Sequence, residues 1–259
     1  MPVFFSNMAD IAKAKGEIYH GLQPGGIACV NLAEKLHYVW KNDIPEHVSK
    51  RYEFGTLGSN CYLKKVNPDG GICLATTIGD INTRLQVLGQ HNQINAVTAS
   101  ALALNLGCSL ESIALGLANY TGYKGRLQQK TAFNGALIID DSYNANPESV
   151  KAAILAIERL PKPHWLIFAD IKELGHFSQD SHIDIGKFAN EHQIDKLLTI
   201  GEFAKYTNNA FDGDKLHFAT NQDIVAYCIE NLPKHATILI KGSNSMNLGG
   251  VVDKIVLGK

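Results

Sequence analysis

The sequence predicts an α/β protein whose last hundred residues form a doubly wound, Rossmann-like parallel sheet. Short apolar runs at 165–169, 197–200, 216–218 and 237–240 alternate with amphipathic helical patterns, and this alternation is typical of parallel sheets. The chain has 259 residues, of which 45% are hydrophobic and 19% charged. It is therefore long enough for one large domain or two ordinary ones, and apolar enough to bury a sizeable core.

The first third of the chain predicts one helix and then a strand-rich portion. Residues 7–22 carry Ile11, Ile18 and Leu22 at helical spacing, and glycines and a proline follow them. The strands expected next have clustered or alternating apolar residues between turn signals and lie at 27–30, 62–63, 72–74 and 85–87.

Two helices are predicted after these strands, one from Asn92 to Leu106 and one from Ser109, a favourable N-cap, to Tyr120. A short buried strand at 136–140 leads into another helix, which begins with Asn146 at the N-cap and Pro147 at the first helical position.

Pro161 and Pro163 interrupt the chain after that helix. We therefore expect a domain boundary there, with domains at 1–159 and 160–259. Within the second domain, the helices that connect the strands are expected at 181–192, at 202–209, from 221 onward and after 240.

The composition of the sequence argues against several classes of binding partner and site. The 24 Lys and Arg residues and the 25 Asp and Glu residues give a net charge of −1, which provides no bulk attraction to nucleic acid or anionic lipid. No apolar run approaches the length of a membrane span. Five cysteines without CxxC spacing favour neither a disulfide framework nor a zinc site. We expect a cytoplasmic protein.

The common nucleotide-binding motifs are missing from the sequence. No GxGxxG follows a strand, which argues against a nucleotide-dependent oxidoreductase on this sheet, and no GxxxxGK[ST] phosphate loop occurs. A phosphate site in this chain must be built from less diagnostic residues, or be completed by residues outside it.

Two clusters at element ends are candidates for binding a nucleotide. Asn92 and Asn95 lie three residues apart at the start of a helix, where their amides either bind a base or ribose or simply cap the helix. Arg126, beside Gly125, presents a forked guanidinium that suits a phosphate, although a solvated surface arginine is the commoner case.

Two further clusters follow predicted strands. The segment from Asp140 to Pro147 holds two carboxylates and two asparagines, more polar groups than a capped turn needs, which favours hydroxyl and anion binding. Lys241-Gly242-Ser243 ends the last strand and either reaches an anion or forms a plain turn.

Six ordered motifs of this chain resemble those of the Mur ligases, and within that family the branch that adds D-alanyl-D-alanine. The motifs are Ala14-Lys15-Gly16-Glu17-Ile18, Gly89 to Ala96, Lys124-Gly125-Arg126-Leu127, Asp140 to Pro147, Glu173-Leu174-Gly175 with His182, and Lys241-Gly242-Ser243.

The resemblance implies an ATP-dependent amide ligase of peptidoglycan precursor synthesis, whose substrates are UDP-N-acetylmuramoyl-tripeptide and D-alanyl-D-alanine. It implies that Lys15 reacts with CO2 to form a carbamate, an anionic oxygen ligand that suits Mg²⁺. Without the resemblance, Lys15 is an ordinary surface lysine.

The resemblance also distributes the remaining roles. It implies that Asn92 and Asn95 hold the adenine side of ATP, Arg126 its phosphates and Asp141 its ribose. The residues it directs toward the peptide substrate are Asn144, Asn146, Lys241 and Ser243.

The chain departs from the family pattern. Family members carry an N-terminal domain and a phosphate loop ahead of the first motif, so we expect a truncated central ATP-binding domain that is inactive alone and lacks its N-terminal partner. Asn244 also stands where the family has arginine. The alternative is a non-catalytic remnant, a binding module that keeps the fold.

Overall fold

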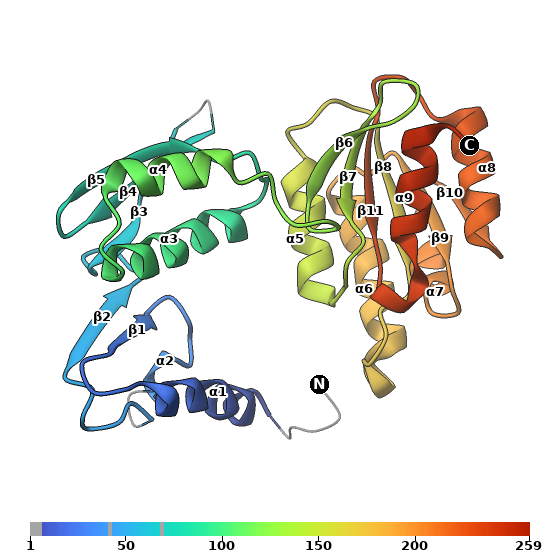
Figure 1. The fold of residues 1–259 in the computed structure, drawn as a ribbon. Coiled ribbons are helices and arrows are strands. Elements are labelled where there is room, and N and C mark those ends of the chain that lie inside the picture. The colour runs from blue at the N-terminus through green and yellow to red at the C-terminus, as the bar shows by residue number, and fades with distance from the viewer. Residues whose placement is uncertain (1–6, 41–42, 68–69) are drawn as a thin grey trace. The chain divides into compact units, whose positions relative to one another are not determined.

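The computed structural model describes residues 7–40, 43–67 and 70–259. This described part of the chain divides into two compact α/β units. The first unit runs to Gln86 and includes Gln90–Tyr120, and the second holds Val87–Gly89 and Thr121–Lys259 (Figure 1).

The first unit begins with helix α1, Met8–Gly16, which Asn7 caps by accepting from the backbone N–H of Asp10. A 3₁₀ helix, Glu17–Gly21, continues it, so the predicted helix at 7–22 changes to the tighter form halfway. The short helix α2, His37–Trp40, follows the first strand.

The sheet of the first unit has the order β1-β2-β3-β4-β5, parallel from β1 to β3 and antiparallel from β3 to β5. Its strands are β1 Ile27–Asn31, β2 Lys50–Phe54, β3 Cys61–Val66, β4 Gly71–Thr76 and β5 Gly79–Arg84. Strand β2 was not predicted, and the strand expected at 85–87 is wrong because β5 ends at Arg84.

Helices α3, Gln90–Asn105, and α4, Leu110–Asn119, complete the first unit. Ser109 is the N-cap of α4, as predicted, and accepts from the backbone N–H of Ser112. Buried Ala96, Val97 and Ala101 of α3 pack against Ile72 and other apolar residues of the strands.

The second unit confirms the doubly wound parallel sheet. Its strand order is β10-β9-β8-β11-β7-β6, and every neighbouring pair is parallel except β6 with β7. The strands are β6 Gln128–Thr131, β7 Leu137–Asp141, β8 His164–Ala169, β9 Lys196–Ile200, β10 Asp214–Phe218 and β11 Thr237–Lys241.

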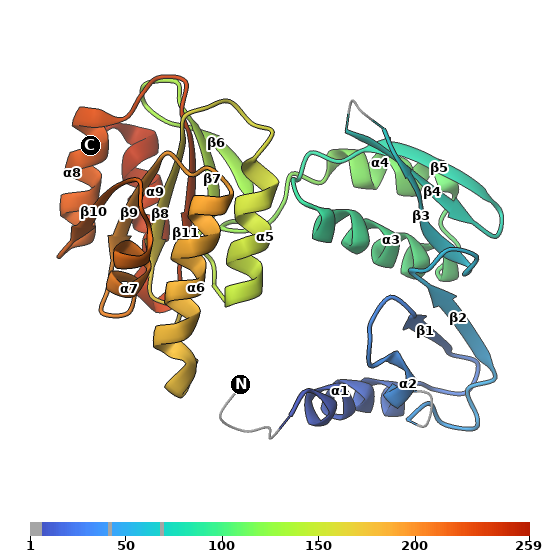
Figure 2. The same cartoon turned by 180° about the vertical axis from the view of Figure 1, so that it is seen from behind.

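Helices cover both faces of this sheet (Figure 2). They are α5 Pro147–Ile157, α6 Ser178–Glu191, α7 Ala204–Ala210, α8 Asn221–Asn231 and α9 Leu248–Leu257. One apolar core packs α8 and α9 against the strands, and a second packs α5, α6 and both ends of α7 against them. Short 3₁₀ turns at Gly175–Phe177 and Asn244–Met246 follow β8 and β11.

The predicted domain boundary at 159/160 is wrong. Strand β7 pairs with β11 along its whole length, from Leu137 opposite Thr237 to Asp141 opposite Lys241, so β6, β7 and α5 belong to the second unit. The physical reason is that Ile138 and Ile139 are fully buried and need cover on both faces of the sheet. The two prolines lie in a short helix-to-strand connection, and the boundary lies near residue 120.

Candidate functional site

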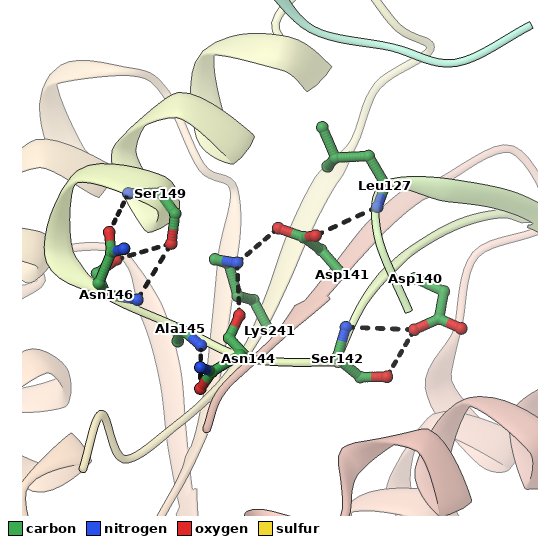
Figure 3. A network of polar contacts seen from close by, with 9 residues as sticks. All are labelled: Leu127, Asp140, Asp141, Ser142, Asn144, Ala145, Asn146, Ser149 and Lys241. Carbon is green, nitrogen blue, oxygen red and sulfur yellow. Dashed lines mark hydrogen bonds and ion pairs between the residues drawn. The ribbon is translucent and has the colours of Figure 1, made fainter. Parts of the chain in front are cut away.

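A buried ion pair lies at the carboxyl edge of the second sheet. Because β7 and β11 are paired in register, their last residues, Asp141 and Lys241, stand opposite one another. The Lys241 Nζ lies 2.6 Å from Asp141 Oδ2 and donates to the backbone oxygen of Asn144 at 2.9 Å (Figure 3). Lys241 therefore fixes both the end of β7 and the loop that follows it.

The second carboxylate oxygen of Asp141 binds another motif segment, 124–127. Asp141 Oδ1 accepts from the backbone N–H of Leu127 at 3.1 Å, and the N–H of Tyr143 donates to the oxygen of Gly125 at 2.9 Å. Gly125 has φ +75°, and a Cβ there would lie 2.9 Å from the Tyr143 nitrogen, so the close approach requires glycine. The segments 124–127, 140–147 and 241–243 thus form one clasped unit, hereafter the motif clasp.

The burial of the ion pair determines how strongly it acts. Lys241 is 2% exposed and Asp141 is 9% exposed. A charge that loses its partner at such a depth destabilises a protein by about 3–5 kcal/mol. The stability of this edge of the sheet therefore depends on both charges of the pair being present.

The neighbouring carboxylate points to the other face of the sheet, as successive residues of a strand do. Asp140 is fully buried and pairs with Lys130 at 2.8 Å. It also accepts from the hydroxyl of Ser142 at 2.6 Å (Figure 3). The two consecutive aspartates therefore act on separate networks.

Asn144 and Asn146 are exposed, and each makes a local hydrogen bond. Asn144 Oδ1 accepts from the backbone N–H of Ala145. Asn146 and Ser149 form a reciprocal capping box at the start of α5, with distances of 2.8 and 3.0 Å (Figure 3). Capping thus accounts for Asn146, and a substrate contact for either asparagine stays a prediction.

Ser243 is buried and joins β11 to the loop after β8. Its Oγ accepts from the backbone N–H of Lys172 at 2.8 Å, and its own N–H donates to the oxygen of Asp170. The residue after it, Asn244, donates from Nδ2 to the oxygen of Tyr143 at 3.1 Å. Ser243 and Asn244 therefore tie the end of β11 to two different loops.

Arg126 remains open to solvent. Its guanidinium carbon lies 4.4 Å from the centre of the Tyr143 ring, a cation–π contact that leaves the outward N–H groups available. An exposed, oriented guanidinium of this kind suits a phosphate.

The remaining predicted residues belong to the first unit. Asn92 and Asn95 share a face of the first two turns of α3, and Asn95 Nδ2 donates to Asn92 Oδ1 at 3.2 Å. Lys15 lies exposed in the last turn of α1. Among the described residues, no group of three His, Cys, Asp or Glu side chains could hold a metal ion.

Two buried residues, His182 and Asp170, hold the loops that follow β8 and β9, and only His182 belongs to the motifs above. His182 is fully buried; its Nε2 accepts from the backbone N–H of Ile171, and its Nδ1–H donates to the oxygen of Ser178. Burial lowers the pKa of His182 and keeps the ring neutral. Asp170 accepts from the backbone N–H groups of 202–204. The sequence signal that could have identified Asp170 is an aspartate directly after an apolar strand.

Sequence reasoning also missed an open pocket of about 400 Å³ beside the motif clasp. Its lining comes from separate segments of the second unit: Tyr123, Lys124, Gly125, Ser142, Tyr143, Asn244, Asn247, Gly249, Gly250 and Asp253.

Two family models match the chain. The Mur ligase middle domain matches residues 3–103, and the Mur ligase, glutamate ligase domain matches residues 125–244. The second match begins at 125, which agrees with a boundary near residue 120.

Characterised relatives align along nearly the whole chain. UDP-N-acetylmuramoyl-tripeptide–D-alanyl-D-alanine ligase of Escherichia coli is 32% identical over 253 residues, 96% of this chain and 56% of that protein. The ligase of the same name from Bacillus subtilis is 30% identical over 257 residues, 95% of this chain and 54% of that protein. The chain therefore spans little more than half the length of these relatives.

Solved structures have the same fold. A crystal structure of MurF from Acinetobacter baumannii superposes with a TM-score of 0.86 at 28% identity, covering 99% of this chain and 58% of that one. MurF from Thermotoga maritima in complex with ADP gives 0.81 at 20% identity, over 98% of this chain and 58% of that one. From both family models, the relatives and the shared fold, we conclude that the chain belongs to the Mur ligase family.

Proposed function

We propose that this chain is the middle and C-terminal part of an ATP-dependent ligase that adds D-alanyl-D-alanine to UDP-N-acetylmuramoyl-tripeptide in peptidoglycan precursor synthesis. The observation that carries the proposal is the motif clasp. Three motif segments, two of them close in sequence and the third about a hundred residues further along the chain, meet at the carboxyl edge of one sheet, held by Lys241, Asp141 and the N–H of Leu127. Ligands of doubly wound sheets bind at that edge.

The proposed reaction needs positioning and charge neutralisation more than covalent chemistry by the protein. ATP phosphorylates the terminal carboxylate of the tripeptide, the amine of D-alanyl-D-alanine attacks the acyl phosphate, and inorganic phosphate leaves. The exposed guanidinium of Arg126 fits a phosphate, and the paired amides of Asn92 and Asn95 fit the adenine side of ATP.

Asp141 is compatible with the ribose role that we propose for it. One of its oxygens faces Lys241 and the other faces Leu127. A carboxylate oxygen is an acceptor of the kind that a ribose hydroxyl requires. The Lys241 ammonium then holds the Asp141 carboxylate in its orientation.

Lys15 fits the carbamate role by its exposure, since CO2 must reach the free amine. A carbamate supplies one anionic oxygen, and Mg²⁺ is commonly bound by one or two carboxylates, substrate phosphates and water. When bound, the ion would neutralise phosphate charge.

We propose that these 259 residues alone do not ligate and bind ATP no tighter than about millimolar. The sequence contains no GxxxxGK[ST] loop, and phosphoryl transfer needs such a cradle around the β- and γ-phosphates. The same observation favours the second candidate, a remnant that binds but does not catalyse. No described helix is long and apolar enough to cross a membrane.

We propose, as a separate point, that the protein works in the cytoplasm, where the precursors of the proposed reaction are made.

A chimaera separates the two candidates. The portion of the E. coli relative that this chain does not match would be fused ahead of Asn7, and phosphate release would be measured with ATP, the tripeptide precursor and D-alanyl-D-alanine. The ligase proposal expects release only when all three substrates are present, and none by the 259-residue chain. A folded chimaera that binds ADP but releases no phosphate would favour the remnant.

A further inference from the structure

Lys15 lies at a junction between two kinds of helix. Helix α1 ends at Gly16, and the 3₁₀ helix Glu17–Gly21 follows without a break. The backbone N–H of Glu17, at the start of the 3₁₀ helix, donates to the oxygens of both Lys13 and Lys15. Hydrogen-bond geometry is poorer in a 3₁₀ helix than in an α-helix. Contacts from the rest of the first unit therefore decide where the backbone of Lys15 lies.

A tryptophan holds the helix on the N-terminal side of Lys15. Helix α2 lies beside α1 (Figure 1), and its last residue, Trp40, donates from Nε1 to the backbone oxygen of Ala12 at 2.9 Å. A carbonyl oxygen has two lone pairs, so Ala12 can accept from the indole without leaving the hydrogen bonds of its own helix. This bond fixes α1 against α2 three residues before Lys15.

Close packing holds the residue directly after Lys15. A Cβ at Gly16 would lie 2.4 Å from Asp43 Oδ2 and 2.9 Å from Trp40 Cδ1, so a side chain at this position would push both residues away. The Asp43 oxygen is buried and has no hydrogen-bond partner among the described residues. Because a buried acceptor without a donor is destabilising, a gain in stability does not explain this contact.

A tyrosine holds the 3₁₀ helix on the other side of the junction. The Tyr19 hydroxyl donates to the backbone oxygen of Cys29, in the middle of β1, at 2.9 Å. Burial raises the pKa of Tyr19, so the phenol keeps the proton that it donates. Tyr19 and Trp40 also pack against the apolar cluster that contains Ala28 and Val30 of β1. Both residues therefore place the junction relative to the same strand.

The side chain of Lys15 differs from its backbone. The backbone lies between two held positions, Ala12 three residues before it and Tyr19 four residues after it. The side chain is exposed. A fixed backbone and an open amine together give a reactive group a defined place while CO2 can still reach it. Such precision matters, because misplacing a catalytic group by about 1 Å can lower a rate about a hundredfold.

We propose that Trp40 and Tyr19 are positioning residues for Lys15. They hold the junction between α1 and the 3₁₀ helix against β1, so that the Lys15 carbamate of the proposed ligase stands in one place relative to the phosphates. Both act through the backbone of Lys15, and neither contacts substrate. This role rests on the proposed function, because an unreactive surface lysine would need no fixed position.

Steady-state kinetics of the chimaera measure the effect on turnover. Trp40→Phe and Tyr19→Phe keep an aromatic ring, and each removes one hydrogen-bond donor. Each should lower kcat about tenfold and leave the KM for ATP within about twofold, because the misplaced group acts in the transition state. Tyr38→Phe, a change on an exposed tyrosine of α2, is the matched control and should leave kcat unchanged.

Chemical rescue provides a readout that a loss of stability would not move. In Lys15→Ala, the small carboxylate that restores turnover diffuses to the site and does not depend on the placement of α1. Adding Trp40→Phe to Lys15→Ala should therefore leave the rescued turnover within about twofold. Equal tenfold losses with and without Lys15 would show that Trp40 only supports the fold, and would overturn the proposal.

Hydrogen exchange in the 259-residue chain tests the hold without catalysis. In Trp40→Phe and Tyr19→Phe, the backbone N–H groups of residues 12–19 should exchange at least about tenfold faster than in the parent. The N–H groups of α3 and α4, in the same unit, should keep their rates and so show that each variant is folded. Unchanged exchange at 12–19 in both variants would overturn the proposal.

The outcomes distinguish this inference from the proposed function. If the chimaera ligates and both variants turn over as fast as Tyr38→Phe, the positioning role fails and the ligase stands. If no chimaera ligates, the ligase proposal fails, and the positioning role fails with it.

Discussion

Replacing Lys241 by methionine should destabilise the second unit severely. The side chain is 2% exposed and holds Asp141 Oδ2 at 2.6 Å and the oxygen of Asn144 at 2.9 Å. Methionine keeps the apolar stem but leaves a buried carboxylate without its counter-charge, which costs about 3–5 kcal/mol. With a urea dependence of about 2 kcal/mol per M, the unfolding midpoint should fall by about 2 M.

Tryptophan fluorescence can follow the second unit by itself. The sequence has two tryptophans, Trp40 in the first unit and Trp165, buried in the core of the second. A Trp40→Phe background leaves Trp165 as the single reporter during urea unfolding. Lys254→Met, a change on an exposed lysine of α9, is the matched control and should stay within about 0.5 kcal/mol of the parent.

A double-mutant cycle assigns the loss to the ion pair. Lys241→Met with Asp141→Asn removes both charges, so the double variant should lose clearly less than the sum of the single losses. Additive losses, or a Lys241→Met variant as stable as the Lys254→Met control, would refute the reasoning that the pair holds the motif clasp.

Three further predictions concern the chemistry, a buried histidine and a helix cap. In the active chimaera, Lys15→Ala should lower the turnover number far more than the nucleotide affinity, and an added small carboxylate should partly restore turnover. Asp141→Ala should chiefly raise the ATP concentration that the reaction needs. Steady-state kinetics measure both effects, and unchanged turnover in Lys15→Ala would contradict the carbamate role. Burial lowers the folded-state pKa of His182 below its usual 6.5, so the folded state resists protonation and the second unit should lose stability as the pH falls below about 6.5. Urea midpoints at pH 7.5 and 5.5 should differ less in His182→Gln than in the parent. His217, whose pKa burial also lowers, contributes to the difference that remains. An equal difference in both proteins would exclude His182. Asn146→Ala should destabilise the second unit by about 1 kcal/mol through loss of the α5 cap, and an unchanged urea midpoint would argue against the capping box.

The elements that the sequence predicted well have strong local signals. The apolar runs that became β8, β9 and β11 are fully or almost fully buried, and α5 has its cap, its proline and its apolar face within twelve residues. Strand β2 was missed because Lys50, Arg51 and Glu53 interrupt its apolar pattern. The domain boundary failed because only the pairing of β7 with β11, which is not local, shows where β7 belongs.

The same limit applies to the site. The sequence predicted that Asp141 and Lys241 each lie at the end of a strand, but the predicted boundary placed the two residues in separate domains. It could not predict that these strands are neighbours, and therefore that Lys241 is an internal partner of Asp141, a hundred residues away. The pocket could not be predicted from the sequence for the same reason: the residues that line it, between 123 and 253, are far apart in the chain.

Product formation by the chimaera tests the central claim most directly. ATP, UDP-N-acetylmuramoyl-tripeptide and D-alanyl-D-alanine would be incubated with it, and the mixture analysed by mass spectrometry, with the 259-residue chain and Lys15→Ala as comparisons. The account predicts the pentapeptide product from the chimaera, none from the chain alone and little from Lys15→Ala. Pentapeptide formed by the chain alone, or equally well without Lys15, would contradict it.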